Sequence, residues 1–302
     1  MFDKLWFITV LFNPVHYSCR KKLYDNFKKH ITDMGANLFT VELAYGDKPF
    51  EVTTGGPNEL QLRTRAVLWH KERLINLAAQ RLPIDTKYIA WVDSDLLWHN
   101  PNFMEDTVLR LQYHPIVQMF SHAMDLDKNY SPIGQPVEGF GYAYHHNLIN
   151  KNSKLKYGRY AHTGYAWAMR SEVFDQMGGL IDFAILGAAD NYMAHCAVGW
   201  ANRMTDSRYH PIYNQKILDW EADCNRFIKG RLGYVPGTIS HFWHGAKSQR
   251  GYNTRAQILI KNSFNPALDL ETALNGTYRI DQNKHEMEHE IYHYFLSRNE
   301  DN

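Results

Sequence analysis

The sequence predicts an α/β fold in which a mostly parallel sheet is flanked by helices. Two observations predict it: short apolar runs alternate with stretches of helical spacing, and one apolar run leads directly into a pair of aspartates. Such alternation is typical of a parallel sheet with both faces covered. The 302 residues, 44% of them hydrophobic, suffice for one sizeable core. We expect a single domain over residues 1–302, with halves at about 1–120 and 121–270 and a polar C-terminal tail or helix, packed on the outside, over about 271–302.

The first half is expected to alternate strands and helices. The apolar run Trp6–Phe12, ended by Asn13-Pro14, predicts a buried first strand. Helical spacing follows through residues 17–31, and Asn37–Leu43 reads as a second strand. Residues 60–80 are expected to form a helix, and Tyr88–Val92 a short buried strand.

The second half begins with a segment of different composition. Residues 121–160 are rich in Tyr, Gly, Asn and His and predict a long loop over the active face, with a hairpin over Pro132–Tyr144 as the alternative. His162–Ala168 predicts a strand. A helix from Ser171 ends at Gly178-Gly179, and another begins after Gly187–Asp190.

Net charge, the longest apolar run and the cysteine content exclude some classes of protein. Thirty-three Lys+Arg against 32 Asp+Glu give a net charge of +1, which excludes a uniformly basic nucleic-acid coat. The longest apolar run, Trp6–Phe12, is far shorter than the ~18–20 residues that cross a bilayer, and the start lacks a signal-peptide pattern. Three widely spaced cysteines indicate free thiols. We expect a cytoplasmic protein without a membrane partner.

The first candidate for chemistry is Asp93-Ser94-Asp95. Two carboxylates at this spacing, placed after a buried strand, can converge on one hard cation, Mg²⁺ or Mn²⁺, that bridges a diphosphate. The alternative is a solvated turn. Asp125-Leu126-Asp127 has the same spacing but no preceding apolar strand, so a solvated turn is expected there.

Two further motifs carry candidate residues. His241 and His244 are followed by Lys247, Arg250 and Arg255; an imidazole can complete a metal site held by Asp95, and the arginines can bind phosphate. Ordinary strand histidines and a solvated loop are the alternative. Asp190, at the end of Gly187-Ala188-Ala189, is either a general base or a helix N-cap.

Taken in order, these motifs resemble one known family. They are Asn13-Pro14, residues 68–76, the Asp93–Asp95 pair, residues 164–168, Gly178–Leu180, Gly187–Asp190 and His241–Arg255. The order is similar to that of nucleotide-sugar-dependent glycosyltransferases of the Rossmann-like GT-A fold, over roughly residues 5–270. It resembles in particular small single-domain transferases of bacteriophages and bacteria. Some phage members of this class transfer sugars onto hydroxymethylated pyrimidines in DNA.

The resemblance implies roles for particular residues. Residues 1–120 bind the nucleotide-sugar, a UDP-sugar, and residues 121–270 supply the acceptor and catalytic side. Mn²⁺ or Mg²⁺ is held by Asp93, Asp95 and His244, with His241 as the alternative third ligand. Asp190 is the base of an inverting enzyme; if it is only a cap, the base lies elsewhere or the enzyme retains configuration. The expected donor contacts are Asn13, Glu42, Lys71, Asn76, Asp93, Arg250 and Arg255.

The acceptor is predicted from charge and aromatic content. Residues 225–268 carry seven basic groups and no acid. Residues 141–170 carry five basic groups, Lys151, Lys154, Lys156, Arg159 and Arg170, among several tyrosines. This composition favours double-stranded DNA with hydroxymethylated bases, with a glycan as the alternative.

Two other function classes are weighed. A non-catalytic nucleotide-sugar binder needs no candidate base. A nucleotidyltransferase is expected to have a Gly-rich phosphate loop after the first strand, and Asn13-Pro14-Val15-His16 has no glycine. A viral origin would place the reaction in the host cytoplasm.

Overall fold

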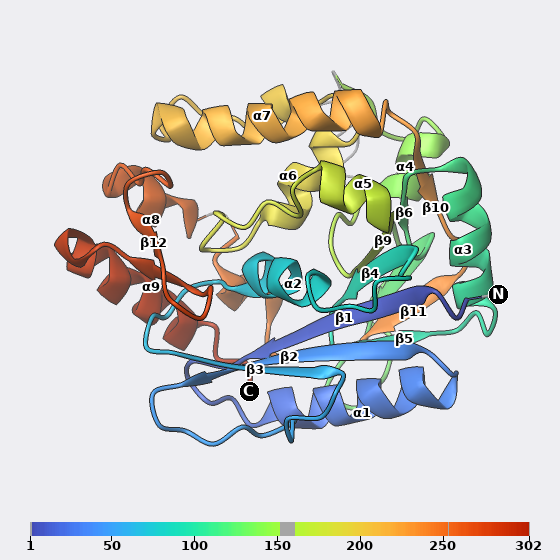
Figure 1. The fold of residues 1–302 in the computed structure, drawn as a ribbon, viewed down its shortest axis with the longest axis horizontal. Coiled ribbons are helices and arrows are strands. Elements are labelled where there is room, and N and C mark those ends of the chain that lie inside the picture. The colour runs from blue at the N-terminus through green and yellow to red at the C-terminus, as the bar shows by residue number, and fades with distance from the viewer. Residues whose placement is uncertain (1, 152–160, 253, 302) are drawn as a thin grey trace.

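The computed structural model describes residues 2–151, 161–252 and 254–301 (Figure 1). Within these residues the main sheet has seven strands in the order β10-β6-β9-β4-β1-β2-β3. Their bounds are β1 Leu5–Phe12, β2 Asn37–Tyr45, β3 Glu59–Thr64, β4 Tyr88–Val92, β6 Ile116–Gln118, β9 Ala166–Arg170 and β10 Leu232–Tyr234. The pairs β1–β2, β1–β4, β2–β3 and β10–β6 are parallel, while β9 runs antiparallel to β4 and β6. The predicted α/β class is confirmed.

Helices cover both faces of this sheet. In Figure 1, α1 (Cys19–Asp33) lies below the sheet, while α2 (Lys71–Ala79) and, further out, α7 (Pro211–Phe227) lie above it. Neighbouring residues of β1 face opposite ways: Phe7 belongs to the core cluster that contains Phe27 of α1, and Ile8 to the cluster that contains Leu74 of α2. This alternation is why a continuous apolar run is needed in a strand that is buried on both faces.

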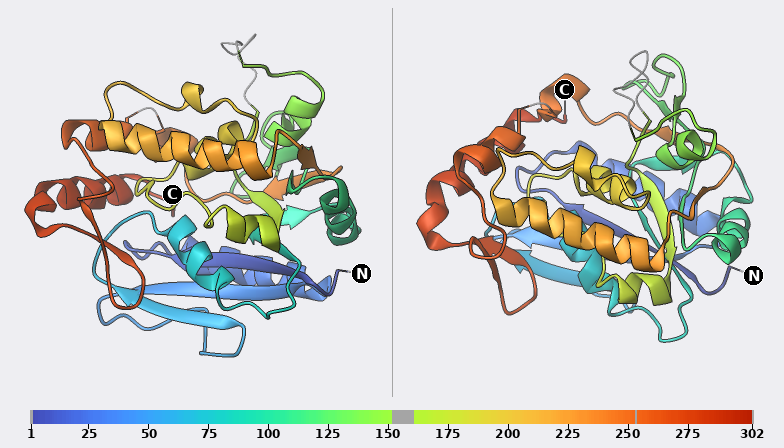
Figure 2. Two further views of the ribbon diagram at one scale, coloured as in Figure 1. Left: turned by 45° about the horizontal axis from the view of Figure 1, so that its top comes forward. Right: turned by 90° about the horizontal axis from the view of Figure 1, so that it is seen from above.

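A second, smaller sheet holds part of the site. Its order is β5-β11-β7-β8, from β5 Leu96–Trp98, β11 Thr238–His241, β7 His122–Asp125 and β8 Val137–Glu138. The remaining elements include α3 Phe103–Tyr113, α4 Phe140–His145, α5 Ser171–Gln176, α6 Ala189–Cys196, η2 Ala201–Arg203, η3 Lys247–Arg250, α8 Ala256–Lys261, the antiparallel pair β12 Leu270–Thr272 and β13 Tyr278–Ile280, η4 Gln282–Lys284 and α9 His285–Ser297. Figure 2 shows α8 and α9 together at one end of the molecule.

Three predicted elements need correction. Residues 60–80 are not one helix: Glu59–Thr64 is β3, because its apolar residues alternate with polar ones as a strand on the sheet edge requires, and the helix begins at Lys71. The strand expected from His162 begins at Ala166. The segment after residue 121 is not one long loop, since β7 pairs antiparallel with β8. Lys154, Lys156 and Arg159 lie outside the described residues.

The C-terminal segment is helical in α9, but its last described residues are not an external tail. Tyr17 donates a hydrogen bond from its hydroxyl to the carbonyl of Phe295, and the Asp301 carboxylate accepts from the backbone N–H groups of Ser18 and Cys19. Glu300 is 3% exposed. The chain end is therefore fastened to the start of α1.

The order of strands predicts where a ligand binds. After β1 the chain adds β2 and β3 on one side, and β4 then pairs on the other side of β1. The carboxyl ends of β1 and β4 therefore meet at a topological switch point, where open α/β sheets bind ligands. Asn13 follows β1 and Asp93 follows β4. Among the described residues, no helix combines the length and apolar character that a membrane crossing requires.

Candidate functional site

A cavity of about 770 Å³ opens at this switch point. Residues from both sheets, from α1, α2 and α6, and from the C-terminal segment line it. They include Asn13, Arg20, Trp69, Lys71, Glu72, Asp93, Asp95, Asp190, Tyr209, His241, His244, Arg250, Tyr252, Arg255, Arg298 and Glu300. Most of the predicted site residues thus meet in one place, although they are far apart in the sequence.

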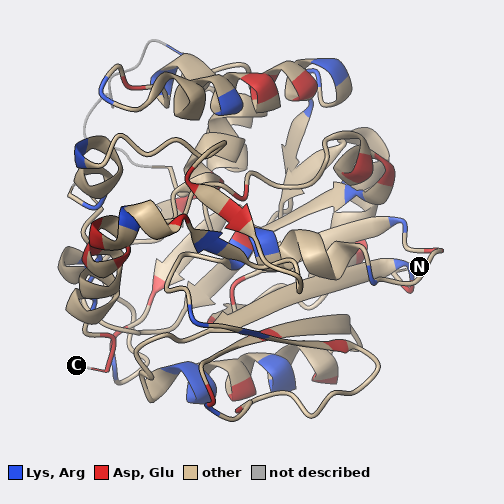
Figure 3. Cartoon of the chain, turned by 60° about the vertical axis from the view of Figure 1, so that its left-hand side comes forward, with Lys and Arg blue, Asp and Glu red and all other residues tan. Residues whose placement is uncertain are grey.

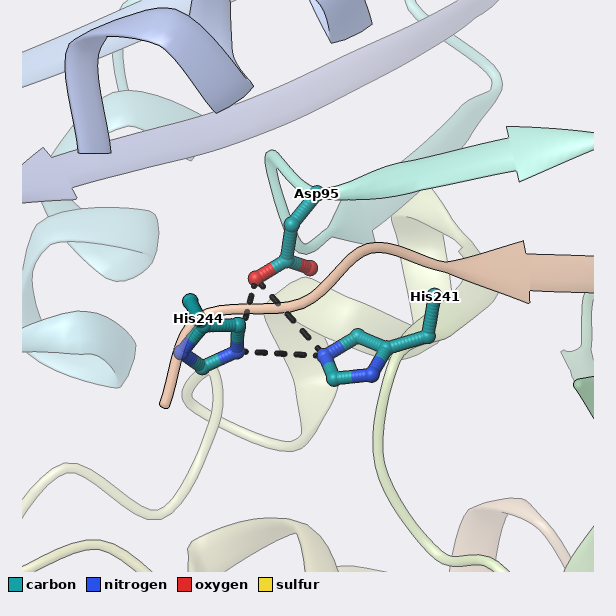
Figure 4. Close-up of side chains that lie close together, drawn as sticks. All are labelled: Asp95, His241 and His244. Carbon is teal, nitrogen blue, oxygen red and sulfur yellow. Dashed lines mark hydrogen bonds and ion pairs between the residues drawn. The ribbon is translucent and has the colours of Figure 1, made fainter. Parts of the chain in front are cut away.

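Asp95, His241 and His244 form a tight cluster in this cavity (Figure 4). Asp95 lies in the turn before β5, His241 ends β11, and His244 follows in the next loop. Oδ2 of Asp95 is 3.1 Å from Nε2 of His244 and 3.8 Å from Nε2 of His241, and the two Nε2 atoms are 3.1 Å apart. All three side chains are buried. The sequence left His241 and His244 as alternatives, and the structure brings both to Asp95.

The cluster has the geometry of a divalent-metal site. Two ligands that are each about 2.1 Å from one metal lie about 3.0 Å apart at an octahedral angle and about 3.4 Å apart at a tetrahedral one. The three distances in the cluster fall close to this range. Among the described residues, Oδ1 of Asp95 is buried and has no hydrogen-bond partner, as expected of a carboxylate oxygen that binds a metal ion. These residues therefore fit a metal.

Asp125 positions His241, contrary to the solvated turn expected for it. Its Oδ1 lies 3.0 Å from Nδ1 of His241 and also accepts a hydrogen bond from the Tyr165 hydroxyl, and Lys247 forms an ion pair with its other oxygen. Because a carboxylate only accepts hydrogen bonds, the ring proton of His241 sits on Nδ1 and its Nε2 lone pair faces the cluster. The sequence reasoning missed this role because the contact joins β7 to β11.

His244 lies between cations and a carboxylate. Nη2 of Arg20 and Nη2 of Arg250 each lie 3.3 Å from its Nδ1, and Glu300 Oε1 lies 3.9 Å from the same atom. Burial, aided by the charges of Arg20 and Arg250, holds the pKa of His244 well below its usual value. The ring is therefore neutral, which is the form that binds metals.

Asp93 lies beside the metal cluster rather than in it. Its carboxylate forms an ion pair with Lys71, and within the described residues the candidate metal group contains only Asp95, His241 and His244. Although Lys71 is buried, the charges of Asp93, Glu72 and Asp190 raise its pKa. Lys71 therefore stays charged in the cavity wall.

Asp190 is the second residue of α6 and lines the cavity. The helix starts at Ala189, and the N-cap position is held by Ala188, whose φ is 80° and whose side chain caps nothing. Asp190 is thus not the N-cap residue, although its Oδ1 accepts a hydrogen bond from the backbone N–H of Asn191. Its charge raises the pKa of both Lys71 and Arg255, which line the same cavity.

Two residues expected at the donor have other partners. Glu42 is buried, and its carboxylate accepts hydrogen bonds from the backbone N–H groups of Glu51, Val52 and Thr53, so it holds that loop and lies outside the main cavity. The Asn76 amide bonds both backbone groups of Leu180, which fixes the segment after α5. Neither residue lines the main cavity, and the polar groups of both satisfy the backbone of their own surroundings.

The remaining predicted donor contacts stay at the cavity. Asn13 lines it while exchanging hydrogen bonds with the backbone of Tyr17. Arg250 is buried against His244, and Nη1 of Arg255 donates to the Tyr294 hydroxyl at 3.2 Å. Arg20, which the sequence did not single out, adds a further cation, with Nη1 3.8 Å from Asp95 Oδ2.

Comparison with known proteins adds little that is specific. No family model and no curated protein sequence matches the chain. Among solved structures, the catalytic domain of Drosophila β1,4-galactosyltransferase 7 in complex with xylobiose aligns at 14% identity over 94% of this chain and 96% of that chain, with a TM-score of 0.43. A mutant of that enzyme in complex with manganese, UDP-Gal and xylobiose aligns at 13% identity over 94% and 97%, with a TM-score of 0.41.

A third solved structure is 4-diphosphocytidyl-2C-methyl-D-erythritol synthase from Anaerococcus prevotii. It aligns at 9% identity over 77% of this chain and 88% of that chain, with a TM-score of 0.37. Scores and identities this low assign neither a family nor a function. The functional conclusion therefore rests on the cavity itself.

Proposed function

We propose that this protein is a glycosyltransferase of the GT-A type, which moves a sugar from a UDP-sugar to an acceptor hydroxyl with the help of a divalent metal. One observation carries the proposal: the Asp95–His241–His244 cluster, the Asp190 carboxylate and several buried cations meet in a single cavity. A pure binding protein needs no carboxylate beyond the metal ligands. The three free thiols suit a reducing compartment, so we assign the reaction to the cytoplasm.

Asp95, His241 and His244 would hold the metal. When bound, the metal supplies Lewis-acid stabilisation of the charge that develops on a diphosphate leaving group. Two imidazoles and one carboxylate favour a transition metal, so Mn²⁺ is expected to bind more tightly than Mg²⁺. Asp95 comes from the half proposed to bind the donor, and the histidines come from the half proposed to bind the acceptor.

Cationic side chains complete the diphosphate site. Arg20, Arg250 and Arg255 line the cavity, and Arg20 and Arg250 both lie against the metal cluster. Guanidinium groups bind phosphate oxygens with two parallel hydrogen bonds. Their charges stabilise the departing nucleotide without the need to reorganise during the reaction.

Asp190 is the proposed general base. Asp190 lines the cavity, as Lys71 and Arg255 do, and it is not the N-cap residue of α6. Removal of the acceptor proton by such a group contributes about 10²–10⁴-fold in rate. A base opposite the leaving group gives inversion at the anomeric carbon.

For the acceptor we favour a carbohydrate hydroxyl over hydroxymethylated DNA. Three groups of the basic run that favoured DNA already have partners in the protein: Lys247 pairs with Asp125, Lys261 with Glu290, and Arg250 contacts His244. Trp69, Tyr209 and Tyr252 line the cavity and offer flat faces for a sugar ring. Figure 3 shows acidic and basic residues interspersed on both α1, at the bottom, and α7, at the top.

The test is a screen of UDP-sugars against acceptors with Mn²⁺, read by mass spectrometry, with glycans and hydroxymethylated DNA as separate arms. We expect transfer to a glycan, loss of transfer in Asp95→Ala, and a loss of about 10²-fold or more in Asp190→Asn. Asp33→Asn, an exposed change on α1, is the control. Full activity of Asp95→Ala would refute the metal site, and transfer to DNA alone would refute the acceptor assignment.

A further inference from the structure

Glu72 is a buried carboxyl group in the cavity that neither the metal site nor the proposed base uses. It lies in the first turn of α2, is 4% exposed and lines the cavity. Within the described residues, its carboxyl group forms no hydrogen bond or ion pair with another side chain. The adjacent Lys71 is paired with Asp93 instead.

In the part of the chain that the structure describes, the fold gives the buried Glu72 carboxyl group no side-chain partner of its own. Burial of an unpaired polar group costs free energy, and the dipole of the short helix α2 offsets only part of that cost. An apolar side chain would fill the same place better. The carboxyl group is therefore expected to have a partner that is present only when a ligand occupies the cavity.

The surrounding charges define which part of a ligand that is. The charges of Asp190 and Asp93 act on Glu72, so this wall of the cavity carries several acidic groups. Lys71 on the same wall is already paired with Asp93, whereas the cations Arg20 and Arg250, which suit a diphosphate, lie around the metal cluster. Neutral hydroxyl groups are compatible with the acidic wall, because they donate hydrogen bonds to carboxyl oxygens.

Protonation strengthens this match. Burial, together with the charges of Asp190 and Asp93, raises the pKa of Glu72 to about 8, although Lys71 opposes the shift. Near neutral pH most of the group is a neutral carboxylic acid, which both donates and accepts hydrogen bonds. Adjacent hydroxyl groups on a sugar ring offer the complementary donor and acceptor pair.

We propose that Glu72 binds hydroxyl groups of the transferred sugar and selects neutral sugars over anionic ones. The inference rests on the proposed function, since it needs a nucleotide-sugar in the cavity. It assigns Glu72 to the sugar and leaves the nucleotide and diphosphate to other residues. Loss of Glu72 should therefore weaken the binding of UDP-sugars but not of UDP.

The test compares the affinities of UDP, UDP-glucose and UDP-glucuronate by calorimetry with Mn²⁺ present. For wild type we expect UDP-glucose to bind at least about tenfold more tightly than UDP-glucuronate. Glu72→Ala should lose about tenfold or more in affinity for UDP-glucose, with UDP binding unchanged. Glu72→Gln, which keeps a donor and an acceptor, should retain UDP-glucose binding, and at pH 9, where Glu72 of wild type is ionised, it should bind UDP-glucuronate better than wild type.

Glu286→Gln, an exposed carboxylate in the first turn of α9, is the matched control for a helix-start carboxylate. If wild type binds neither UDP nor any UDP-sugar, the proposed function fails. If wild type binds UDP-glucose and both Glu72 variants leave its affinity relative to UDP unchanged, the Glu72 assignment is overturned while the function stands. Circular dichroism checks that each variant is folded. Should Glu72→Ala unfold, the near-isosteric Glu72→Gln still tests the assignment, because unchanged discrimination against UDP-glucuronate at pH 9 in that variant overturns it.

Discussion

At the scale of single residues, metal binding depends on the side chains that orient the metal ligands as well as on the ligands themselves. Asp125 contacts Nδ1 of His241, and Glu300 lies near Nδ1 of His244, in each case on the side of the ring away from the Nε2 atom in the cluster. Carboxylates in such positions fix the tautomer and the orientation of a ligating imidazole, and their loss typically costs about 10–100-fold in metal affinity. Both were invisible in the sequence, because each contact joins segments far apart in the chain.

The first prediction concerns Asp125→Ala. Loss of the acceptor at Nδ1 frees His241 to rotate and to change tautomer, so Mn²⁺ affinity should fall by about 10–100-fold. Electron paramagnetic resonance of free Mn²⁺ measures this directly. Asp127 lies two residues further along the chain, and its carboxylate accepts hydrogen bonds from the backbone N–H groups of Asn129 and Ser131. Asp127→Ala should therefore leave the affinity for Mn²⁺ unchanged. Equal affinities for all three proteins would show that Asp125 has no positioning role.

The second prediction follows from the raised pKa of Glu72. The folded chain keeps a proton on this group up to about pH 8, whereas the unfolded chain releases it near the ordinary value of 4.5. Between these values the folded state binds more protons, so the group favours folding at low pH and this contribution is lost as the pH rises through 8. Gln does not titrate.

Thermal unfolding between pH 6 and pH 9 should therefore show Glu72→Gln gaining stability relative to wild type as the pH increases. Glu286→Gln, an exposed change at the start of α9, is the control over the same range. A constant difference between Glu72→Gln and wild type across this window would mean that the pKa of Glu72 is not raised.

At the scale of elements, the turn before β9 sets the position of the proposed base. A Cβ atom at Gly164 would lie 2.6 Å from Oδ2 of Asp190 and 3.2 Å from Cε1 of His162. Gly164→Ala should therefore displace the Asp190 carboxylate. A shift of about 1 Å in such a group can lower the rate about 10²-fold.

Single-turnover transfer should drop by that order in Gly164→Ala, with Mn²⁺ affinity retained. The control is Gly56→Ala, where the added Cβ would come no closer than 3.6 Å to another group. Unchanged transfer in Gly164→Ala would argue that Asp190 tolerates displacement and is not the base.

The segment after α9 is the second element with a predicted effect. Glu300 accepts hydrogen bonds from Nε and Nη2 of Arg20 and from Nε of Arg298, and the charges of these arginines hold its pKa below the ordinary 4.5 despite burial. Glu300→Ala removes the buried carboxylate that both arginines share, and breaking such a buried ion pair costs about 3–5 kcal/mol. Urea unfolding measures it.

Glu286→Ala, an exposed acidic residue at the start of α9, is the control and should cost less than about 1 kcal/mol.

The lowered pKa of Glu300 also makes its contribution to stability depend on pH. Its contribution is full above the unfolded value of 4.5 and is lost as the pH falls below it. A Glu300→Ala protein as stable as wild type at neutral pH would contradict the network.

Much of the element order was predictable, because local patterns dictate it. The run Trp6–Phe12 and the strand Tyr88–Val92 are apolar enough to be buried on both faces, and Ser171 starts a helix that Gly178 ends. The strand at Glu59–Thr64 was not predictable in this way. The spacing of its Leu residues fits either a helix or a strand until the neighbouring strand is known. The roles of Glu42 and Asn76 also depended on backbone groups that only the fold brings near.

At the scale of the whole molecule, the segregated charges of the sequence meet again in the fold. The basic run 225–268 and the acidic residues 281–302 are joined by the Lys261–Glu290 ion pair and by the contact of His244 with Glu300. The net charge of +1 therefore does not conceal a wholly unpaired basic face. The cations that remain at the cavity suit a diphosphate, a compact anion, better than a long duplex.

The central claim is that Asp95, His241 and His244 hold a metal that binds the diphosphate of a nucleotide-sugar. Its most direct test is the titration of Mn²⁺ into the protein with and without UDP, followed by electron paramagnetic resonance. We predict one bound Mn²⁺, bound more tightly when UDP is present, and loss of this site in His244→Ala. The coupling is reciprocal, so Mn²⁺ must tighten UDP binding by the same factor. Absence of a Mn²⁺ site, or UDP affinity independent of Mn²⁺, would contradict the claim.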